Sequence, residues 1–151
     1  MSQTLAAVYV HVVFSTKNRH PFRRDKVVRE KTHKGLGALA QHSGCQPIAI
    51  GGVEDHVHLL IRLTPTTALS NLVRDLKSKS TKWLKARQGN LSVFAWQAGY
   101  GAFSVGAHEL EGVVAYIADQ EAHHAKFSFQ DEFRKICADC GVELDERYAW
   151  T

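Results

Sequence analysis

The chain has 151 residues, of which 44% are hydrophobic and 23% are charged, and its formal net charge is +4. This length suits one globular domain with a hydrophobic core and is short for two domains. No apolar run approaches the ~18–20 residues of a membrane-spanning helix, and the first residues lack the basic stretch of a signal peptide. We therefore expect a single domain over residues 1–151 and a cytoplasmic protein.

The first part of the chain predicts three strands and one helix. β-Branched and aromatic residues alternate over residues 6–15, which predicts a strand, and the basic stretch 16–22 predicts a loop. A helix is expected over residues 23–42. The apolar runs 47–53 and 55–63 follow each other closely, so we expect them to form a hairpin.

The second part predicts mostly helices. Residues 67–87 carry apolar side chains three and four positions apart, which is typical of an amphipathic helix. Residues 94–97 and 102–105 flank a glycine-rich turn and predict two short strands. Residues 108–124 and 129–138 predict two further helices.

The order of these elements predicts an α+β fold of the ferredoxin-like or RRM-like class. In such a split β-α-β sandwich, an antiparallel sheet carries two helices on one face. The tyrosine-bearing helix 108–124 would be a C-terminal addition to this core.

The basic residues form two clusters, which suit the phosphate backbone of nucleic acids. A solvated loop and a solvated helix face would show the same pattern. The first cluster is Lys17, Arg19, His20, Arg23, Arg24 and Lys26, and the second is Lys77, Lys79, Lys82, Lys85 and Arg87.

The three cysteines do not indicate a disulfide framework, because their number is odd. Cys137 and Cys140 have the spacing of half a zinc site, but no second pair of cysteines completes it. We interpret them as two ordinary thiols one helical turn apart.

Two histidines are candidate metal ligands. His56 and His58 lie two positions apart in a predicted strand, so both imidazoles point to the same face of the sheet. His11 is expected on the neighbouring central strand. Paired histidines on a strand are also common as partly exposed polar residues, so this pair alone does not establish a metal site.

A second group of polar residues lies on the predicted helix 108–124. Tyr116 and Gln120 are four positions apart and therefore neighbours on one helix face, and His123 or His124 continues that stripe. A tyrosine beside an amide and histidines suggests a site, although an amphipathic helix can carry the same residues on a solvated face.

These motifs together resemble those of the single-tyrosine HUH transposases, which include small insertion-sequence enzymes and REP-associated tyrosine transposases. The matching segments are residues 51–60 (GGVEDHVHLL), 96–101 (WQAGYG) and 116–124 (YIADQEAHH). Residues 10–19 and 145–150 are also similar, so the resemblance covers essentially the whole chain.

The resemblance implies a DNA transposase that cleaves and rejoins single-stranded DNA at element ends. In this family the tyrosine, here Tyr116, is the nucleophile and forms a 5′-phosphotyrosine, leaving a free 3′-OH. His56, His58 and Gln120 would hold Mg²⁺ or Mn²⁺. Asp55 and His124 are candidates for supporting these ligands.

The resemblance also implies the partners. Family members are homodimers in which the active site is shared between subunits, and they act on single-stranded DNA with hairpin ends. A tyrosine ring can stack on an unpaired base, and basic side chains neutralise phosphates. The candidate DNA contacts are Lys17, Arg19, Arg23, Lys77, Lys79, Lys82 and Tyr100.

Two other functions fit parts of the sequence. A non-enzymatic, RRM-like nucleic-acid-binding protein would explain the fold and the basic clusters, but it would leave the paired histidines and Tyr116 without a role. A metal-dependent phosphodiesterase would use His56 and His58 with water as the nucleophile.

Overall fold

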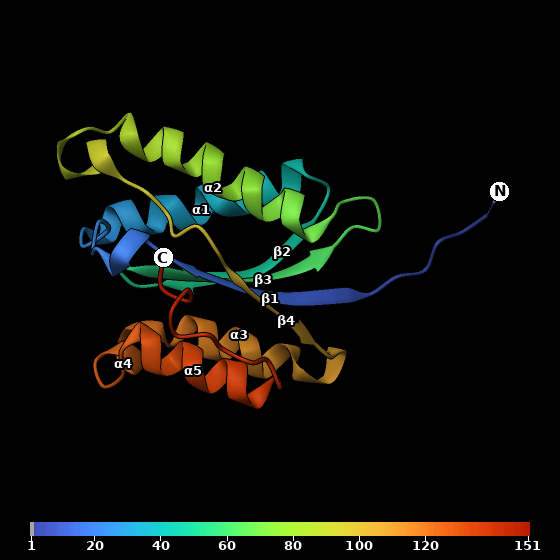
Figure 1. Ribbon diagram of the computed structural model, residues 1–151. Coiled ribbons are helices and arrows are strands. Elements are labelled where there is room, and N and C mark those ends of the chain that lie inside the picture. The colour runs from blue at the N-terminus through green and yellow to red at the C-terminus, as the bar shows by residue number, and fades with distance from the viewer. Residues whose placement is uncertain (1) are drawn as a thin grey trace.

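A four-stranded antiparallel sheet is the middle layer of the computed structural model, which describes residues 2–151 (Figure 1). Its strands are β1 (Val8–Ser15), β2 (Gln46–Gly52), β3 (His56–Leu63) and β4 (Gly101–Val105). They lie in the order β2-β3-β1-β4, so that β1 and β3 are central. This order confirms the predicted ferredoxin-like class.

Helices cover both faces of the sheet (Figure 1). One face carries α1 (Lys26–His42) and α2 (Leu69–Lys85), as expected for this class. The other face carries α3 (Leu110–Ala118), α4 (Gln120–His124) and α5 (Phe129–Asp139). Short 3-10 turns lie at Lys17–Arg19, Gly89–Val93 and Ala107–Glu109.

The two faces of the central strands have different compositions. Val12 and Phe14 of β1 belong to the large apolar cluster that includes Leu36 of α1 and Leu76 of α2. Val13, between them in sequence, packs instead with Phe133 of α5. Side chains alternate between the faces of a strand, and both faces are covered here, so the central strands are buried along most of their length.

Of the two short strands predicted at residues 94–97 and 102–105, the first is wrong and the second is confirmed. Only the second segment forms a strand, β4, which pairs with β1. Residue Trp96 makes a single bridge with Thr16, and its indole nitrogen donates to Ser80 Oγ at 2.9 Å. Phe94 and Trp96 are buried against α2, so tertiary packing holds this segment away from its expected partner strand.

The predicted helix 108–124 is also wrong as a single helix. It divides into α3 and α4 at Asp119, whose φ of −96° and ψ of 16° are not helical. Before the break, α3 lies so close to β2 that a Cβ on Gly51 would come within 2.6 Å of the Ile117 carbonyl oxygen. After it, the side chain of Gln120 turns into the protein interior.

Within residues 2–151, no helix combines the length and the apolar character that crossing a bilayer requires.

Candidate functional site

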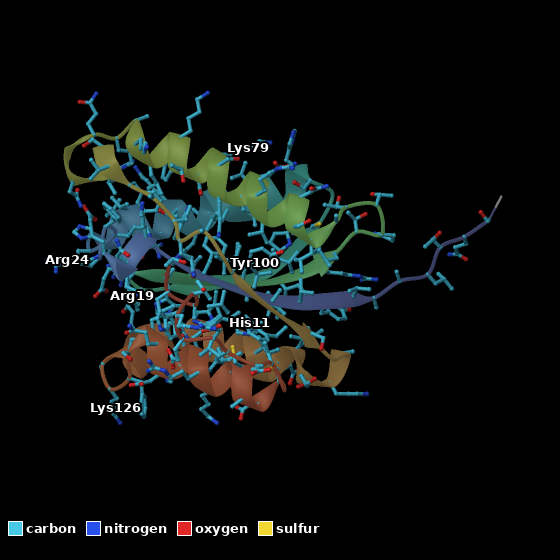
Figure 2. The ribbon with its side chains drawn as sticks, viewed as in Figure 1. His11, Arg19, Arg24, Lys79, Tyr100 and Lys126 are labelled. Carbon is cyan, nitrogen blue, oxygen red and sulfur yellow. The ribbon has the colours of Figure 1, made fainter. Side chains whose placement is uncertain are left out.

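The two histidines of β3 face the layer formed by α3, α4 and α5, and both are fully buried. His58 lies opposite Val13 of β1, and its Nδ1 is 2.8 Å from Nε2 of His11. Figure 2 shows His11 between the sheet and the C-terminal helices. The prediction that His11 lies on the neighbouring central strand is therefore confirmed.

A glutamate that was not among the predicted site residues lies at the centre of the cluster. Glu132 comes from α5 and is 4% exposed. Its Oε1 lies 2.9 Å from Nε2 of His58, 3.3 Å from Nε2 of His56 and 3.1 Å from Nε2 of His124. One sequence signal points to it: Glu132 interrupts the buried stripe of Phe129, Phe133 and Cys137 along the helix.

Tyr116 and Gln120 meet this same carboxylate. The Tyr116 hydroxyl donates a hydrogen bond to Oε2 of Glu132, and its ring centroid is 5.7 Å from that of His58. The Gln120 amide nitrogen donates to Oε2 of Glu132 at 3.2 Å, and its oxygen lies 3.1 Å from Nε2 of His56. One chain therefore brings its tyrosine and its histidines together.

Asp55 fixes the orientation of His56. Its Oδ1 accepts a hydrogen bond of 2.7 Å from Nδ1 of His56, which leaves Nε2 directed at Gln120 and Glu132. A carboxylate behind a histidine in this way sets the tautomer of the ring and increases its basicity as a ligand.

The electrostatics of the cluster keep two of its imidazoles neutral. Burial, together with the proximity of His58, lowers the pKa of His11 to about 3, and burial lowers that of His58 to about 4. Burial alone would also lower the pKa of His56, but its hydrogen bonds with Asp55 and Glu132 raise it. Neutral imidazoles are the form that binds metal ions.

The pKa values of Glu132 and Tyr116 shift in opposite directions. Burial would raise the pKa of Glu132, but the surrounding imidazoles hold it well below its usual range. Burial and the hydrogen bond to Glu132 raise the pKa of Tyr116 above its usual value. In this arrangement Glu132 is an anion and Tyr116 is a neutral phenol.

The donor set fits a divalent metal ion. Ligand atoms of His56, His58, His124 and Glu132 all lie within 4.8 Å of one another, and the Gln120 oxygen adjoins them. Imidazole nitrogens with carboxylate and amide oxygens suit cations such as Mn²⁺ and, with more of its water shell retained, Mg²⁺. Cys137 and Cys140 do not belong to this cluster.

A cavity of about 380 Å³ opens beside the cluster. Its lining includes Asp55, His124 and Arg19. Arg19 is half-buried and Lys17, two residues before it, is exposed. Arg19 is therefore the predicted DNA contact that lines this cavity, and Figure 2 shows Arg19 on the same side of the sheet as the C-terminal helices.

The structure does not favour a phosphate contact for two other predicted residues. Arg23 is fully buried, and its Nη2 donates to the carbonyl oxygens of Val53 and His56. The ammonium of Lys77 donates to the backbone carbonyls of residues 97–99, and burial lowers its pKa to about 8. The side chains of Arg23 and Lys77 therefore bind backbone carbonyl oxygens of the protein itself.

The remaining predicted DNA contacts lie away from the cluster. Lys79 and Lys82 are exposed on α2, across the sheet from the histidines (Figure 2). Tyr100 is 38% exposed beside Lys77, whose ammonium lies 5.7 Å from the ring centroid. A DNA strand touching all of these residues and the cluster would have to pass around the edge of the sheet.

Comparisons with known proteins agree with this geometry. The model of the IS200-like transposase family matches residues 4–120. A proposed transposase from Deinococcus radiodurans R1 is 24% identical, with a TM-score of 0.63, over 80% of this chain and 95% of its own. A REP-associated tyrosine transposase bound to a REP hairpin is 15% identical, with a TM-score of 0.58, over 82% of this chain and 74% of its own. No curated protein matches the chain significantly.

These comparisons differ in what they establish. At such low identity the two solved structures support the fold. The family match covers more than half of the chain and includes the paired histidines, Tyr116 and Gln120, but it ends before His124 and Glu132. On this match, the chain belongs to the IS200-like transposase family.

Proposed function

We propose that this transposase cleaves and rejoins single-stranded DNA through a 5′-phosphotyrosine on Tyr116, with a divalent cation held by His56, His58 and Gln120. One observation carries the proposal. The Tyr116 hydroxyl and the Nε2 atoms of both histidines converge on the same buried carboxylate within a single chain. A nucleophile and a metal site must be this close to act on one phosphodiester.

The ligands have separate tasks in this proposal. His58 and His56 direct their Nε2 atoms to the centre of the cluster, and Asp55 holds the ring of His56 in place. A Mg²⁺ or Mn²⁺ ion bound there would offset the negative charge that develops on the phosphate oxygens. The stiff central strand keeps the two imidazoles in register during the reaction.

Tyr116 performs the covalent step. Its Oη attacks phosphorus, a bond between Oη and phosphorus forms, and the bond between phosphorus and the 3′-oxygen breaks. The phenol proton passes to a bound water and the leaving 3′-oxygen takes up a proton, which gives a 5′-phosphotyrosine and a 3′-OH. A second 3′-OH can reverse the step and join new ends, because the phosphotyrosine retains the bond energy.

The substrate in this proposal is a single strand with a hairpin at the element end. The structural neighbour bound to a REP hairpin supports it, together with the cavity lined by Arg19 beside the cluster. Arg19 and Lys17 are the phosphate contacts that we favour. The homodimer with a shared site, the single domain over residues 1–151 and the cytoplasmic location stay predictions.

The test uses labelled single-stranded oligonucleotides from the flanks of the gene, incubated with Mg²⁺ or Mn²⁺. The wild-type chain should form a protein–DNA adduct that resists denaturation, and Tyr116→Phe should form none while binding the same oligonucleotides. Tyr9→Phe is the matched control and should still form the adduct. Cleavage that survives in Tyr116→Phe would indicate a water nucleophile and a phosphodiesterase instead.

A further inference from the structure

The cluster contains a buried carboxylate, that of Glu132, which lies outside the residues matched by the family model. Residues 4–120 match the family model, whereas Glu132 lies twelve positions further on, in α5. Its side chain is 1% exposed and contacts six polar side chains: His56, His58, His123, His124, Tyr116 and Gln120. Phe129 and Phe133 on either side anchor α5 against β1, which fixes the carboxylate above the histidines.

A carboxylate in this position needs a positive partner. Transfer of an unpaired carboxylate from water into the interior costs several kcal/mol. Within residues 2–151, no arginine or lysine forms an ion pair with Glu132; Arg23 donates to backbone carbonyls, and Arg29 pairs with Glu121 at 3.2 Å. The groups around Glu132 are instead imidazole nitrogens, an amide and a phenol.

The contacts around Glu132 resemble the coordination sphere of a metal ion. Three imidazole nitrogens, from His56, His58 and His124, lie between 2.9 and 3.3 Å from one oxygen of Glu132. All four ligand atoms fall within 4.8 Å of one another, slightly more than the maximum of about 4.4 Å for donors about 2.0–2.2 Å from a common ion. A small shift of the Glu132 side chain would make room for an ion between these four ligand atoms.

We propose that Glu132 is a direct ligand of the catalytic divalent cation and that it forms, with His56, His58 and His124, a site completed by the C-terminal helix. This inference rests on the proposed function, because it concerns the same cation. It adds one negative charge, from Glu132, and a third imidazole, from His124, to the ligands that the family resemblance implies. Three imidazoles and one carboxylate favour a transition-metal ion, so the site prefers Mn²⁺ to Mg²⁺.

The experiment measures metal binding in the absence of DNA. Metal-free wild-type protein and the Glu132→Gln variant are titrated with Mn²⁺ by calorimetry, and free Mn²⁺ is followed by its EPR signal. Loss of the carboxylate should raise the Kd for Mn²⁺ by at least about tenfold, since even groups behind a metal ligand contribute that much. Wild-type protein should also bind Mn²⁺ more tightly than Mg²⁺.

Asp131→Asn is the matched control. It makes the same carboxylate-to-amide change one position earlier, on the exposed side of α5, where Asp131 pairs only with Arg134. This variant should keep the wild-type Kd. An equal Kd for Glu132→Gln and wild type would overturn the proposal.

A second variant distinguishes the loss of a metal ligand from a general disturbance of packing. Glu132→Asp keeps the charge and should bind Mn²⁺ more tightly than Glu132→Gln, whereas equal losses in both would overturn the role as a ligand. Binding of Mn²⁺ also raises the Tm. For each variant, the rise relative to its own metal-free form gives the same comparison, even where the variant is less stable than wild type.

The two proposals fail in different ways. Wild-type protein that binds Mn²⁺ through Glu132 but forms no Tyr116 adduct would refute the phosphotyrosine chemistry and leave the ligand in place. Adduct formation by wild type, with unchanged Mn²⁺ affinity in Glu132→Gln, would refute the ligand alone.

Discussion

The guanidinium of Arg23 has no exposed surface, although arginine usually stays in water. Its Nη2 donates to the carbonyl oxygens of Val53 at 2.7 Å and of His56 at 2.8 Å. Burial lowers its pKa to about 9, so the group is still charged at neutral pH. The side chain therefore holds the loop that leads into β3, which carries His56 and His58.

Arg23→Met should destabilise the fold. Methionine has a similar length but no donor, so the carbonyls of Val53 and His56 would lose their partner inside the protein. Each buried acceptor left without a hydrogen bond costs about 1–3 kcal/mol, so we expect a loss of about 2–4 kcal/mol in the free energy of unfolding. Urea denaturation measures this loss in the free energy of unfolding. Arg24→Met, at an exposed neighbour, should change the value by less than about 0.5 kcal/mol, and an equally small change in Arg23→Met would contradict this role.

Single residues differed in how well the sequence predicted them. The spacing of His56 and His58, and of Tyr116 and Gln120, placed each pair on one strand or helix face, and the resemblance to the HUH transposases supplied their predicted roles. For Glu132 the sequence shows only a charged residue within the apolar stripe of a helix. No local pattern indicates the histidines around it, because these contacts depend on where α5 docks.

At the scale of elements, α1 shows how a helix is tied to the site. His33 of α1 accepts a hydrogen bond from Nη1 of Arg23 at 3.3 Å, and a neutral imidazole is required for this. Burial, together with the charges of Arg23 and Arg29, lowers the pKa of His33 to about 3. Protonation of His33 would remove the acceptor and place two cations side by side.

This contact predicts a dependence of stability on pH. Below the ordinary histidine pKa of 6.5 the unfolded chain takes up a proton at His33, whereas the folded chain does not until about pH 3. The free energy of unfolding should therefore fall as the pH decreases from about 6.5 towards 3. In His33→Gln, which keeps an acceptor but cannot titrate, the loss between pH 7 and pH 5 should be smaller by about 2 kcal/mol.

Urea denaturation at each pH provides the measurement. The other buried histidines remain in both proteins, so the difference between the two slopes isolates His33. His42→Gln, on an exposed histidine at the end of the same helix, is the matched control. Identical pH profiles for His33→Gln and wild type would show that the contact with Arg23 does not require a neutral ring.

The elements themselves were largely predictable, and the two errors share a cause. Strands β1, β2 and β3 and helices α1, α2 and α5 follow from alternation and helical spacing, with ends displaced by a few residues. Residues 94–97 have the composition of a strand but pack against α2, and the helix expected over 108–124 breaks at Asp119. Both depend on contacts between distant segments, which local patterns do not contain.

At the scale of the whole molecule, the C-terminal tail connects the helical layer to the sheet. Trp150 packs on α5, with ring centroids 6.2 Å from Phe129 and 6.0 Å from Phe133. The next residue, Thr151, accepts a hydrogen bond of 3.0 Å from the backbone of Ala98, just before β4. The tail thus holds α5 in the position that places Glu132 in the cluster.

Trp150→Ala should loosen this layer. The ring is only partly buried, so we expect a loss of about 1–3 kcal/mol in the free energy of unfolding, below the cost of removing a fully buried tryptophan. Amide hydrogen exchange should become faster in α5 but not in α2, which lies on the other face of the sheet. Tyr148→Ala, two residues away and 69% exposed in wild type, should leave the exchange of α5 unchanged. Unaltered exchange in Trp150→Ala would contradict a tethering role.

The cluster of histidines and Glu132 extends from β3 to α5, so its members are synthesised at different times. A growing chain releases His56, His58 and then Tyr116 from the ribosome before Glu132 and the tail emerge. If Glu132 is a ligand, a nascent chain or a gene copy interrupted shortly after Tyr116 would carry the nucleophile without a complete metal site. The capacity to cut DNA would then belong only to chains translated through their last helix.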